Sequence, residues 1–208
     1  AQGRDYHQVI EKKLALLLII TGALIALYPL GEWAYTHYLQ QKTMVAWEEE
    51  VQAVAEPEKE VIDEPAGVQQ PEVPLPIAVL TIKKINLELP VFQGATTTNL
   101  RIGAGLVEDG VNAGESGTVI ISAHRSHTFG RQFNRLDELE KGDQIEITSR
   151  DGVYKYEVYK TDIVKPEEIA VQQGDNAEKT LLLITCHPLY SINPPYRLLV
   201  WAKQIEPA

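Results

Sequence analysis

Seven short runs rich in β-branched and aromatic residues follow one another between residues 77 and 203, and they restrict this part of the chain to an all-β fold. The runs are AVLTI, LELPV, GTVIIS, QIEIT, VYKYEVYKT, TLLLIT and YRLLVWAK. Turn residues separate them, and Asp151-Gly152 between two alternating runs indicates a tight hairpin. We therefore predict a small closed β-barrel or sandwich of about 130 residues.

Two short helices are expected within this β-rich part. Phe133, Leu136 and Leu139 share one face of a predicted helix from Gln132 to Leu139. We expect another turn or two of helix after Thr98. Because both segments are short, they are predicted to connect strands, and the sheet remains the main element of the fold.

An uncharged stretch of 18 residues near the start of the chain is just long enough to cross the hydrocarbon core of a bilayer. It reads LALLLIITGALIALYPLG and runs from Leu14 to Gly31. A core helix of a soluble protein can have a similar composition, but the length favours a membrane span. We therefore predict a transmembrane helix over residues 14–31.

The charges on either side of this stretch predict its orientation. Arg4, Lys12 and Lys13 precede it, whereas Glu32 follows it. Because basic residues favour the cytoplasmic side, residues 1–13 are expected in the cytoplasm and the chain after residue 32 outside the cell. A cleavable signal peptide is the alternative, but YPLGEWAYTHYLQQ lacks the small-x-small pattern of a cleavage site. We therefore favour an uncleaved signal anchor.

Residues 32–76 are expected to form an extracellular spacer. Its part from Thr43 to Ala55 can continue as a polar helix, and five prolines follow between Pro57 and Pro76. Nine acidic residues stand against one lysine from Glu48 to Glu72, which predicts an extended, self-repelling linker. A calcium or partner site is the alternative, but no ligand-loop spacing occurs. The net charge of −10 and the lack of a basic stripe argue against nucleic acid as a partner.

Cys186 is the only cysteine in the chain, so it cannot form an internal disulfide. It is either buried packing at the end of TLLLIT or a thiol kept for chemistry. A catalytic thiolate needs a base or an imidazolium partner, and a cationic or amide group for the developing oxyanion. His124 follows GTVIIS, and Arg197 opens the last strand, which is expected to pair antiparallel with the strand of Cys186. Both are candidate partners, although a surface role is the commoner fate of an arginine.

Two other readings of the histidines are weaker. His187 directly follows Cys186, but consecutive side chains of a strand point to opposite faces. His124 and His127 have H-x-x-H spacing, and Cys186 or His187 could complete a zinc site. The irregular loop and the lack of a Cys-x-x-Cys or Glu partner make this signal weak. We predict no metal site and no cofactor.

Three motifs in order make the chain resemble the sortases, the membrane-anchored cysteine transpeptidases of Gram-positive bacteria. The L-x-T-C motif spans Leu183 to Cys186, and Arg197 follows in an R-L-L-V strand. The histidine motif is present as SAHRS, and INLELPVFQGATTTNLRIGAGLVEDG and FNRLDELEKGDQIEI resemble the family's connecting sequence. Ala123 replaces the glycine that commonly precedes the histidine, and Leu182 replaces a threonine. Neither change removes a reacting group.

The resemblance implies a closed eight-stranded sortase-type β-barrel over residues 77–208, with short helices, after one N-terminal transmembrane helix and an acidic, proline-rich linker. It implies that Cys186 attacks the bond after threonine in a C-terminal sorting signal of the LPXTG or LPXTA type and forms a thioester. His124 would exchange protons with Cys186 and the leaving amine. Arg197 would hold the substrate backbone and stabilise the oxyanion.

The resemblance also implies substrate-binding residues and partners. Thr185 precedes the cysteine in the motif, and Ile169 and Val171 are the apolar residues of the loop over residues 165–178, which would line the groove for the Leu-Pro part of the signal. The implied partners are surface proteins that carry sorting signals, a peptidoglycan precursor amine of the lipid II type, and the membrane. TCHPLYSINPPYR and AHRSHTFGRQFNRL look most like class D, with a class A-like enzyme as the alternative.

Two alternatives to transpeptidation remain open on the sequence. The same Cys, His and Arg would serve a membrane-anchored cysteine peptidase that uses water as the final acceptor. A non-catalytic surface domain would instead use Cys186 as core packing and would leave its thiol inert.

Overall fold

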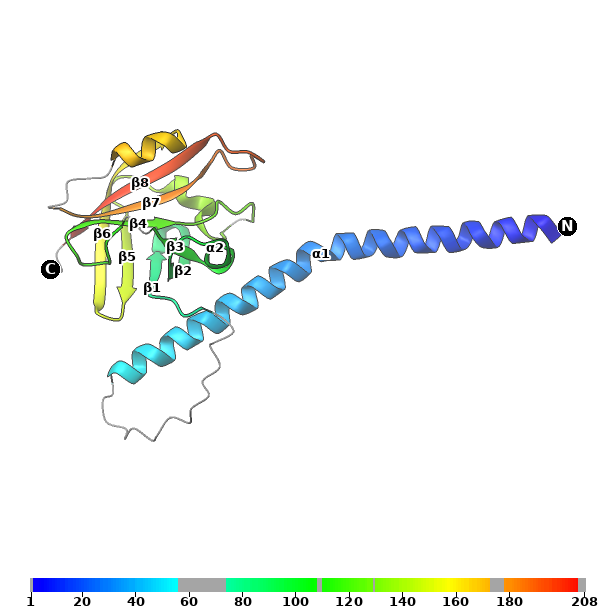
Figure 1. The fold of residues 1–208 in the computed structure, drawn as a ribbon, viewed down its shortest axis with the longest axis horizontal. Coiled ribbons are helices and arrows are strands. Elements are labelled where there is room, and N and C mark those ends of the chain that lie inside the picture. The colour runs from blue at the N-terminus through cyan, green and yellow to red at the C-terminus, as the bar shows by residue number, and fades with distance from the viewer. Residues whose placement is uncertain (1, 56–73, 108–109, 129, 173–177, 206–208) are drawn as a thin grey trace. The chain divides into compact units, whose positions relative to one another are not determined.

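The computed structural model describes residues 2–55, 74–107, 110–128, 130–172 and 178–205. The chain divides into two compact units, Ala1–Leu39 and Gln40–Ala208. Helix α1 (Gln2–Ala55) supplies all of the described part of the first unit and extends into the second (Figure 1). The described segments 74–107, 110–128, 130–172 and 178–205 form the strands and short helices of the second unit.

Helix α1 contains the predicted transmembrane stretch. In the part of the chain that the structure describes, one helical segment, Lys12–Gln52, is long and apolar enough to cross a membrane, with a mean hydropathy of 2.3 over its best window. None of that window is buried. A core helix of a soluble protein would bury this surface, so the exposed apolar side chains favour the membrane anchor. The predicted spacer is helical up to Ala55. Residues 56–73, which contain most of its acidic residues and prolines, lie outside the described residues.

Eight strands close into a barrel, as the resemblance implies. Their order around it is β1-β2-β3-β4-β7-β8-β6-β5, and β1 pairs with β5 to close it. The strands are β1 (Ala78–Ile82), β2 (Leu87–Gln93), β3 (Ala104–Leu106), β4 (Gly117–Ser122), β5 (Gln144–Ser149), β6 (Gly152–Val164), β7 (Lys179–His187) and β8 (Tyr196–Ile205). Four short helices connect them: η1 (Lys83–Ile85), α2 (Thr97–Ile102), η2 (Phe133–Glu138) and η3 (Pro166–Gln172).

The seven predicted runs correspond to all strands except β3. The predicted hairpin is confirmed, because Ser149 of β5 pairs with Gly152 of β6 across a two-residue turn. The predicted helix near residue 132 is a 3-10 helix over Phe133–Glu138, and the turn after Thr98 is α2. Strand β3 was missed because Ala-Gly-Leu is too short and too small in its side chains to give an alternating pattern.

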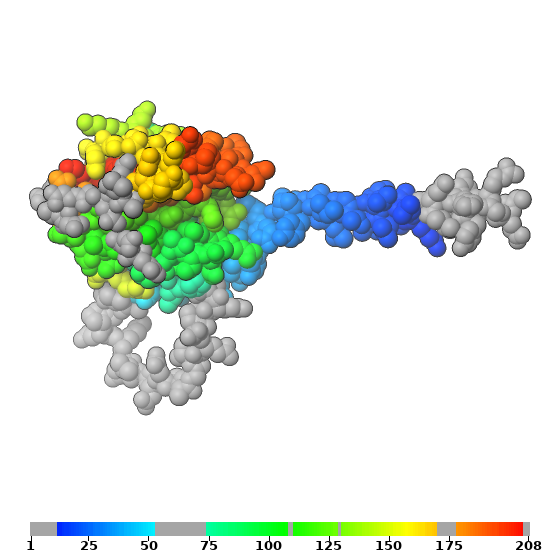
Figure 2. Space-filling view, turned by 45° about the horizontal axis from the view of Figure 1, so that its top comes forward, coloured from blue at the N-terminus to red at the C-terminus, as the bar shows by residue number. Residues whose placement is uncertain are grey.

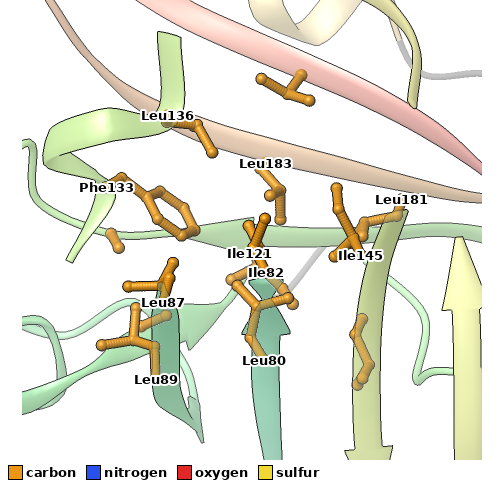
Figure 3. Close-up of a cluster of buried hydrophobic side chains, with 14 of the residues drawn as sticks. Leu80, Ile82, Leu87, Leu89, Ile121, Phe133, Leu136, Ile145, Leu181 and Leu183 are labelled. Carbon is orange, nitrogen blue, oxygen red and sulfur yellow. The ribbon is translucent and has the colours of Figure 1, made fainter. Parts of the chain in front are cut away.

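Strands β4, β7 and β8 are buried on both faces, which explains their nearly continuous apolar sequence. Leu181 and Leu183 of β7 point into the barrel and pack in one cluster with Leu80, Ile82 and Ile121 (Figure 3). The alternate residues form a second cluster on the outer face, made of Ile120, Val164, Leu182, Ile184, Leu199 and Trp201. Side chains on β7 thus alternate between an inner core and an outer cluster.

Candidate active site

Strands β4 and β7 lie side by side and parallel, and their register brings two predicted residues together. Gly117 pairs with Lys179, and the pairing continues without a shift to Ser122 and Ile184. Continuing this register by two residues beyond the end of β4 sets His124 beside Cys186. Because neighbouring strands lie about 5 Å apart, the two side chains start within reach of each other.

Strand β8 brings the third predicted residue to the other side of Cys186. Strands β7 and β8 are antiparallel, as the sequence predicted, and Cys186 pairs directly with Arg197. Side chains of directly opposed residues lie on the same face of a sheet. Cys186 and Arg197 therefore lie side by side on β7 and β8, and the continued register of β4 would set His124 on the other side of Cys186, so that the three candidates form one row.

The row belongs to the outer face of the barrel. Leu182, Ile184 and Leu199 pack in the outer cluster. Because every second side chain of a strand lies on the same face, Cys186 shares the face of Leu182 and Ile184, and Arg197 shares the face of Leu199. Ile169 of η3 packs against the same cluster. Figure 1 shows η3 over β7 and β8, and Figure 2 shows the yellow segment that contains it beside the orange-red segment of the β7–β8 loop. The outer cluster, with η3 packed against it, therefore lies directly before Cys186 on the outer face of β7.

The thiol is in a position to react. Cys186 is half-buried and free, and His124 is exposed. Arg197 is half-buried, and its Nη1 donates hydrogen bonds to the carbonyl oxygens of Pro194 (3.0 Å) and Tyr196 (2.9 Å). These contacts hold the guanidinium against the loop that leads into β8. Its remaining N–H groups can donate to a substrate carbonyl or an oxyanion, because arginine carries five donors and stays charged.

Thr185 has a different role from the predicted substrate contact. It lies on the opposite face from Cys186, it is only 2% exposed, and its Oγ1 donates a 2.9 Å hydrogen bond to the carbonyl oxygen of Ala123. The backbone N–H of Ala123 donates in turn to the carbonyl oxygen of Ile184. Thr185 therefore ties the end of β4, just before His124, to β7, just before Cys186.

Replacing Thr185 by valine is expected to lower the free energy of unfolding by about 1–3 kcal/mol, because the buried carbonyl of Ala123 loses its donor while the side-chain volume is kept. Urea unfolding of the two proteins measures the difference. Thr185→Ser keeps the hydroxyl and serves as the matched control, with a smaller expected loss. Equal stability of the valine variant and the wild type would argue against this assignment.

Of the two apolar residues predicted to contact the sorting signal, the structure describes the side chain of Ile169 but not that of Val171. Ile169 is half-buried and packs on the outer cluster that ends at Cys186. The backbone of Val171 is part of η3, but its side chain lies outside the described residues, as does the loop over residues 173–177. Ile169 thus remains a candidate for substrate contact on geometric grounds.

The neighbours of His124 and Cys186 form a cluster that the sequence did not predict. Arg125 is buried, with its side chain 2% exposed, and its Nη1 lies 2.8 Å from Nδ1 of His187. Its Nη2 lies 2.7 Å from Oδ2 of Asp137 in η2. Burial, with the charge of Arg125 as the next cause, lowers the pKa of His187, and Asp137 opposes that shift. His187 is thus turned away from the thiol, as its position in the strand predicted.

The remaining predicted alternative concerned a metal. His127 is exposed, and its ring contacts Tyr190 of the β7–β8 loop at a centroid distance of 5.3 Å. Within the described ranges, no group of three or more His, Cys, Asp or Glu side chains gathers in a way that could hold a metal ion. The H-x-x-H spacing therefore has no third ligand there.

Comparisons with known proteins agree with this geometry. The model of the sortase domain family matches residues 80–205. Sortase D of Bacillus subtilis is 34% identical over 137 residues, which cover 65% of this chain and 67% of that protein. The structure of a lid mutant of sortase A from Corynebacterium diphtheriae is 30% identical, with a TM-score of 0.58, over 64% of this chain and 71% of that one.

A third comparison concerns the fold alone. A sortase D5 transpeptidase from Clostridium perfringens covers 81% of this chain and 99% of its own, with a TM-score of 0.63 and 24% identity. The similarity to the Bacillus subtilis class D enzyme agrees with the class suggested by the sequence. Since the family model spans the barrel from β1 to β8, the chain belongs to the sortase family of cysteine transpeptidases.

Proposed function

We propose that Cys186, His124 and Arg197 are the catalytic residues of this transpeptidase, and that its substrates are surface proteins with a C-terminal sorting signal of the LPXTG or LPXTA type. The observation that supports the proposal is the strand register: Cys186 pairs with Arg197, and the pairing of β4 with β7, continued two residues past Ser122, sets His124 beside Cys186. A thiol, an imidazole and a guanidinium in that order supply a nucleophile, a proton carrier and an anion-binding group.

In the first step, the thiolate of Cys186 attacks the carbonyl carbon of the threonine in the signal. The carbonyl oxygen takes the negative charge, and the guanidinium of Arg197 binds it. When the tetrahedral intermediate collapses, the carbon–nitrogen bond after threonine breaks and His124 gives a proton to the leaving amine. The products are a thioester on Cys186 and the released C-terminal peptide.

In the second step, an amine of a peptidoglycan precursor attacks the thioester. His124 takes the proton from the attacking amine, Arg197 binds the oxyanion again, and Cys186 leaves as the thiolate. A new amide bond joins the surface protein to the precursor. Both the bond broken and the bond formed are amides, so no external energy source is needed.

The apolar helix α1 fits the membrane attachment of such an enzyme. We propose that residues 1–13 lie in the cytoplasm and that the barrel lies outside the cell, on the basis of the basic residues before the span and the acidic ones after it. This orientation puts the thiol on the side of the membrane where cell-wall precursors and sorting signals emerge.

A peptide assay tests the function directly. The full chain in detergent micelles is mixed with an LPXTG-type peptide, with and without an amine such as triglycine, and the products are separated by mass. Transpeptidation predicts a peptide joined to the amine as the main product when the amine is present. Hydrolysis to the free threonine carboxylate at the same rate in both mixtures would identify a peptidase, and intact peptide in both would reject the proposed substrate.

A further inference from the structure

The buried cluster beside the catalytic row bridges the same two strand ends. Arg125 directly follows His124, and His187 directly follows Cys186. Arg125 and His187 are therefore 62 residues apart, as are Ser122 and Ile184, the last pair in the register of β4 and β7. The 2.8 Å contact between Arg125 Nη1 and His187 Nδ1 therefore continues the pairing with side chains after the backbone ladder has ended.

A second contact brackets the catalytic pair on its other side. The hydrogen bond from Thr185 to the carbonyl oxygen of Ala123 lies one residue before His124 and Cys186. The Arg125–His187 contact lies one residue after them. His124 and Cys186 are thus held between two cross-strand hydrogen bonds, both made by side chains of the opposite face.

The chemistry of the partners fixes the protonation of His187. Arginine has only donors and keeps its charge, so Nδ1 of His187 must accept the hydrogen bond with its lone pair. The proton of the neutral ring then sits on Nε2. A doubly protonated ring would lose this acceptor and would place a second positive charge against the buried guanidinium.

Arg125 depends strongly on this acceptor. Its side chain is 2% exposed, and its Nε is buried without a hydrogen-bond partner among the described residues. Two contacts thus hold the charge, with Asp137 and His187. A buried charge that loses a partner is strongly destabilised unless the structure rearranges, and here the backbone next to His124 would have to move.

We propose that Arg125 and His187, with Asp137, form a positioning cluster that holds His124 against Cys186 only while His187 is neutral. This proposal rests on the catalytic roles assigned above. The cluster touches neither the substrate nor the thiol. It acts through the backbone of the two residues that do, and it makes the alignment of the catalytic pair sensitive to acid.

The groups that face His187 support the direction of this effect. Arg125 comes from the loop after β4 and Asp137 from η2, while Cys186 precedes His187 on β7 and Tyr196 is its partner on β8. The pKa of His187 is lowered from the ordinary value of 6.5, mainly by burial. The folded protein therefore binds this proton less readily than the unfolded chain. The stability linked to the neutral ring is complete above pH 6.5 and falls as the pH drops below it.

Two variants of His187 separate positioning from simple packing. Asparagine places an amide oxygen near the position of Nδ1 and cannot be protonated, whereas leucine offers no acceptor. In the peptide and amine assay at neutral pH, His187→Leu is expected to lower kcat by about 10- to 100-fold with KM changed less than about twofold, because misalignment affects the reaction more than binding. His187→Asn is expected to keep kcat within about threefold of the wild type.

The pH profile provides the readout that packing alone would not change. As the pH falls well below 6.5, the wild type is expected to lose activity when His187 becomes protonated, so His187→Asn is expected to retain a larger fraction of its neutral-pH kcat. Arg125→Met is expected to resemble His187→Leu, and combining the two is expected to add little. A wild-type kcat in His187→Leu, or identical pH profiles for wild type and His187→Asn, would overturn the proposal.

A spectroscopic measurement tests the contact independently of activity. Long-range proton–nitrogen correlation spectra of the full chain, labelled at histidine nitrogen and held in detergent micelles, distinguish the two neutral tautomers. At neutral pH His187 is expected to carry its proton on Nε2 alone, and Arg125→Met is expected to remove this preference. A charged ring or a proton on Nδ1 in the wild type would overturn the proposal. If the wild type shows no transpeptidation, the proposed function fails, and these spectra still decide whether the cluster exists.

Discussion

Replacing Cys186 by alanine is expected to lower kcat/KM for transpeptidation by at least about 10³-fold, because no other group in the row can form the thioester. The fold should tolerate the change, since the side chain is half-buried and the substitution removes one sulfur atom. Thermal unfolding of the variant should therefore match that of the wild type. This pair of results would separate loss of chemistry from loss of structure.

A matched experiment addresses the reading of Cys186 as inert packing. A charged, methanethiosulfonate-type thiol reagent is expected to label Cys186 in the folded chain and to stop turnover in proportion to labelling. The thiol is the only one present, so mass alone identifies the site. A thiol that stays unlabelled in the folded chain, without turnover, would support the non-catalytic binding domain. Full transpeptidation by Cys186→Ala, or a labelled enzyme that remains active, would show that Cys186 is not the nucleophile.

Replacing Arg197 by alanine is expected to reduce kcat by about 10²- to 10³-fold, the usual effect of removing one donor to an oxyanion. Arg197 pairs with Cys186 across β7 and β8, so we expect its guanidinium to reach the oxyanion that forms when the thiol attacks. Arg197→Lys keeps the charge but loses the planar set of donors, so we expect an intermediate rate. Steady-state kinetics with the peptide and amine measure all three enzymes.

Arg150 provides the control for a general loss of positive charge. It lies in the turn before Gly152, at the end of β6 opposite to Val164, which pairs with Arg197. Arg150→Ala should change kcat less than about twofold, because it is remote from the reacting atoms. Equal losses in Arg150→Ala and Arg197→Ala would show that Arg197 has no specific role.

The sequence predicted most of the barrel because its strands carry clear patterns. Long strands such as β6 and β8 contain enough residues to show an alternation of buried and exposed side chains in the sequence, whereas β3 contains only three residues. Gly105 in β3 allows the backbone at Ala95 to pack closely against the strand, since an added Cβ would lie 2.5 Å from Cα of Ala95. Such a strand is defined by tertiary contact with its neighbours, and its own residues give little signal.

The candidate site was predictable to different degrees for different residues. The pairing of Cys186 with Arg197 follows from two strands joined by one loop, which favours an antiparallel neighbour. The placement of His124 near Cys186 depends on two parallel strands that are far apart in sequence. The sequence suggested that the two apolar strands end at the same edge, and the family motifs then pointed to His124. Motifs also suggested a substrate role for Thr185, but strand alternation turns its side chain to the opposite face.

The Arg125–His187 contact could not be predicted from the sequence alone. Both residues look like ordinary polar residues just after a strand, and nothing local indicates that Arg125 is buried. The signal was present in the order of the residues: Arg125 follows His124 as His187 follows Cys186. It becomes informative only when the register of β4 and β7 is known.

The central claim is that Cys186 forms a thioester with the threonine of a sorting signal, and intact-protein mass spectrometry tests it most directly. The full chain is incubated with a small panel of LPXTG- and LPXTA-type peptides in the absence of an amine and then quenched in acid. The account predicts an adduct that equals the peptide up to its threonine, located on Cys186, absent in Cys186→Ala and released by adding an amine. Peptide cleavage without any adduct, or an adduct that persists in Cys186→Ala, would contradict it.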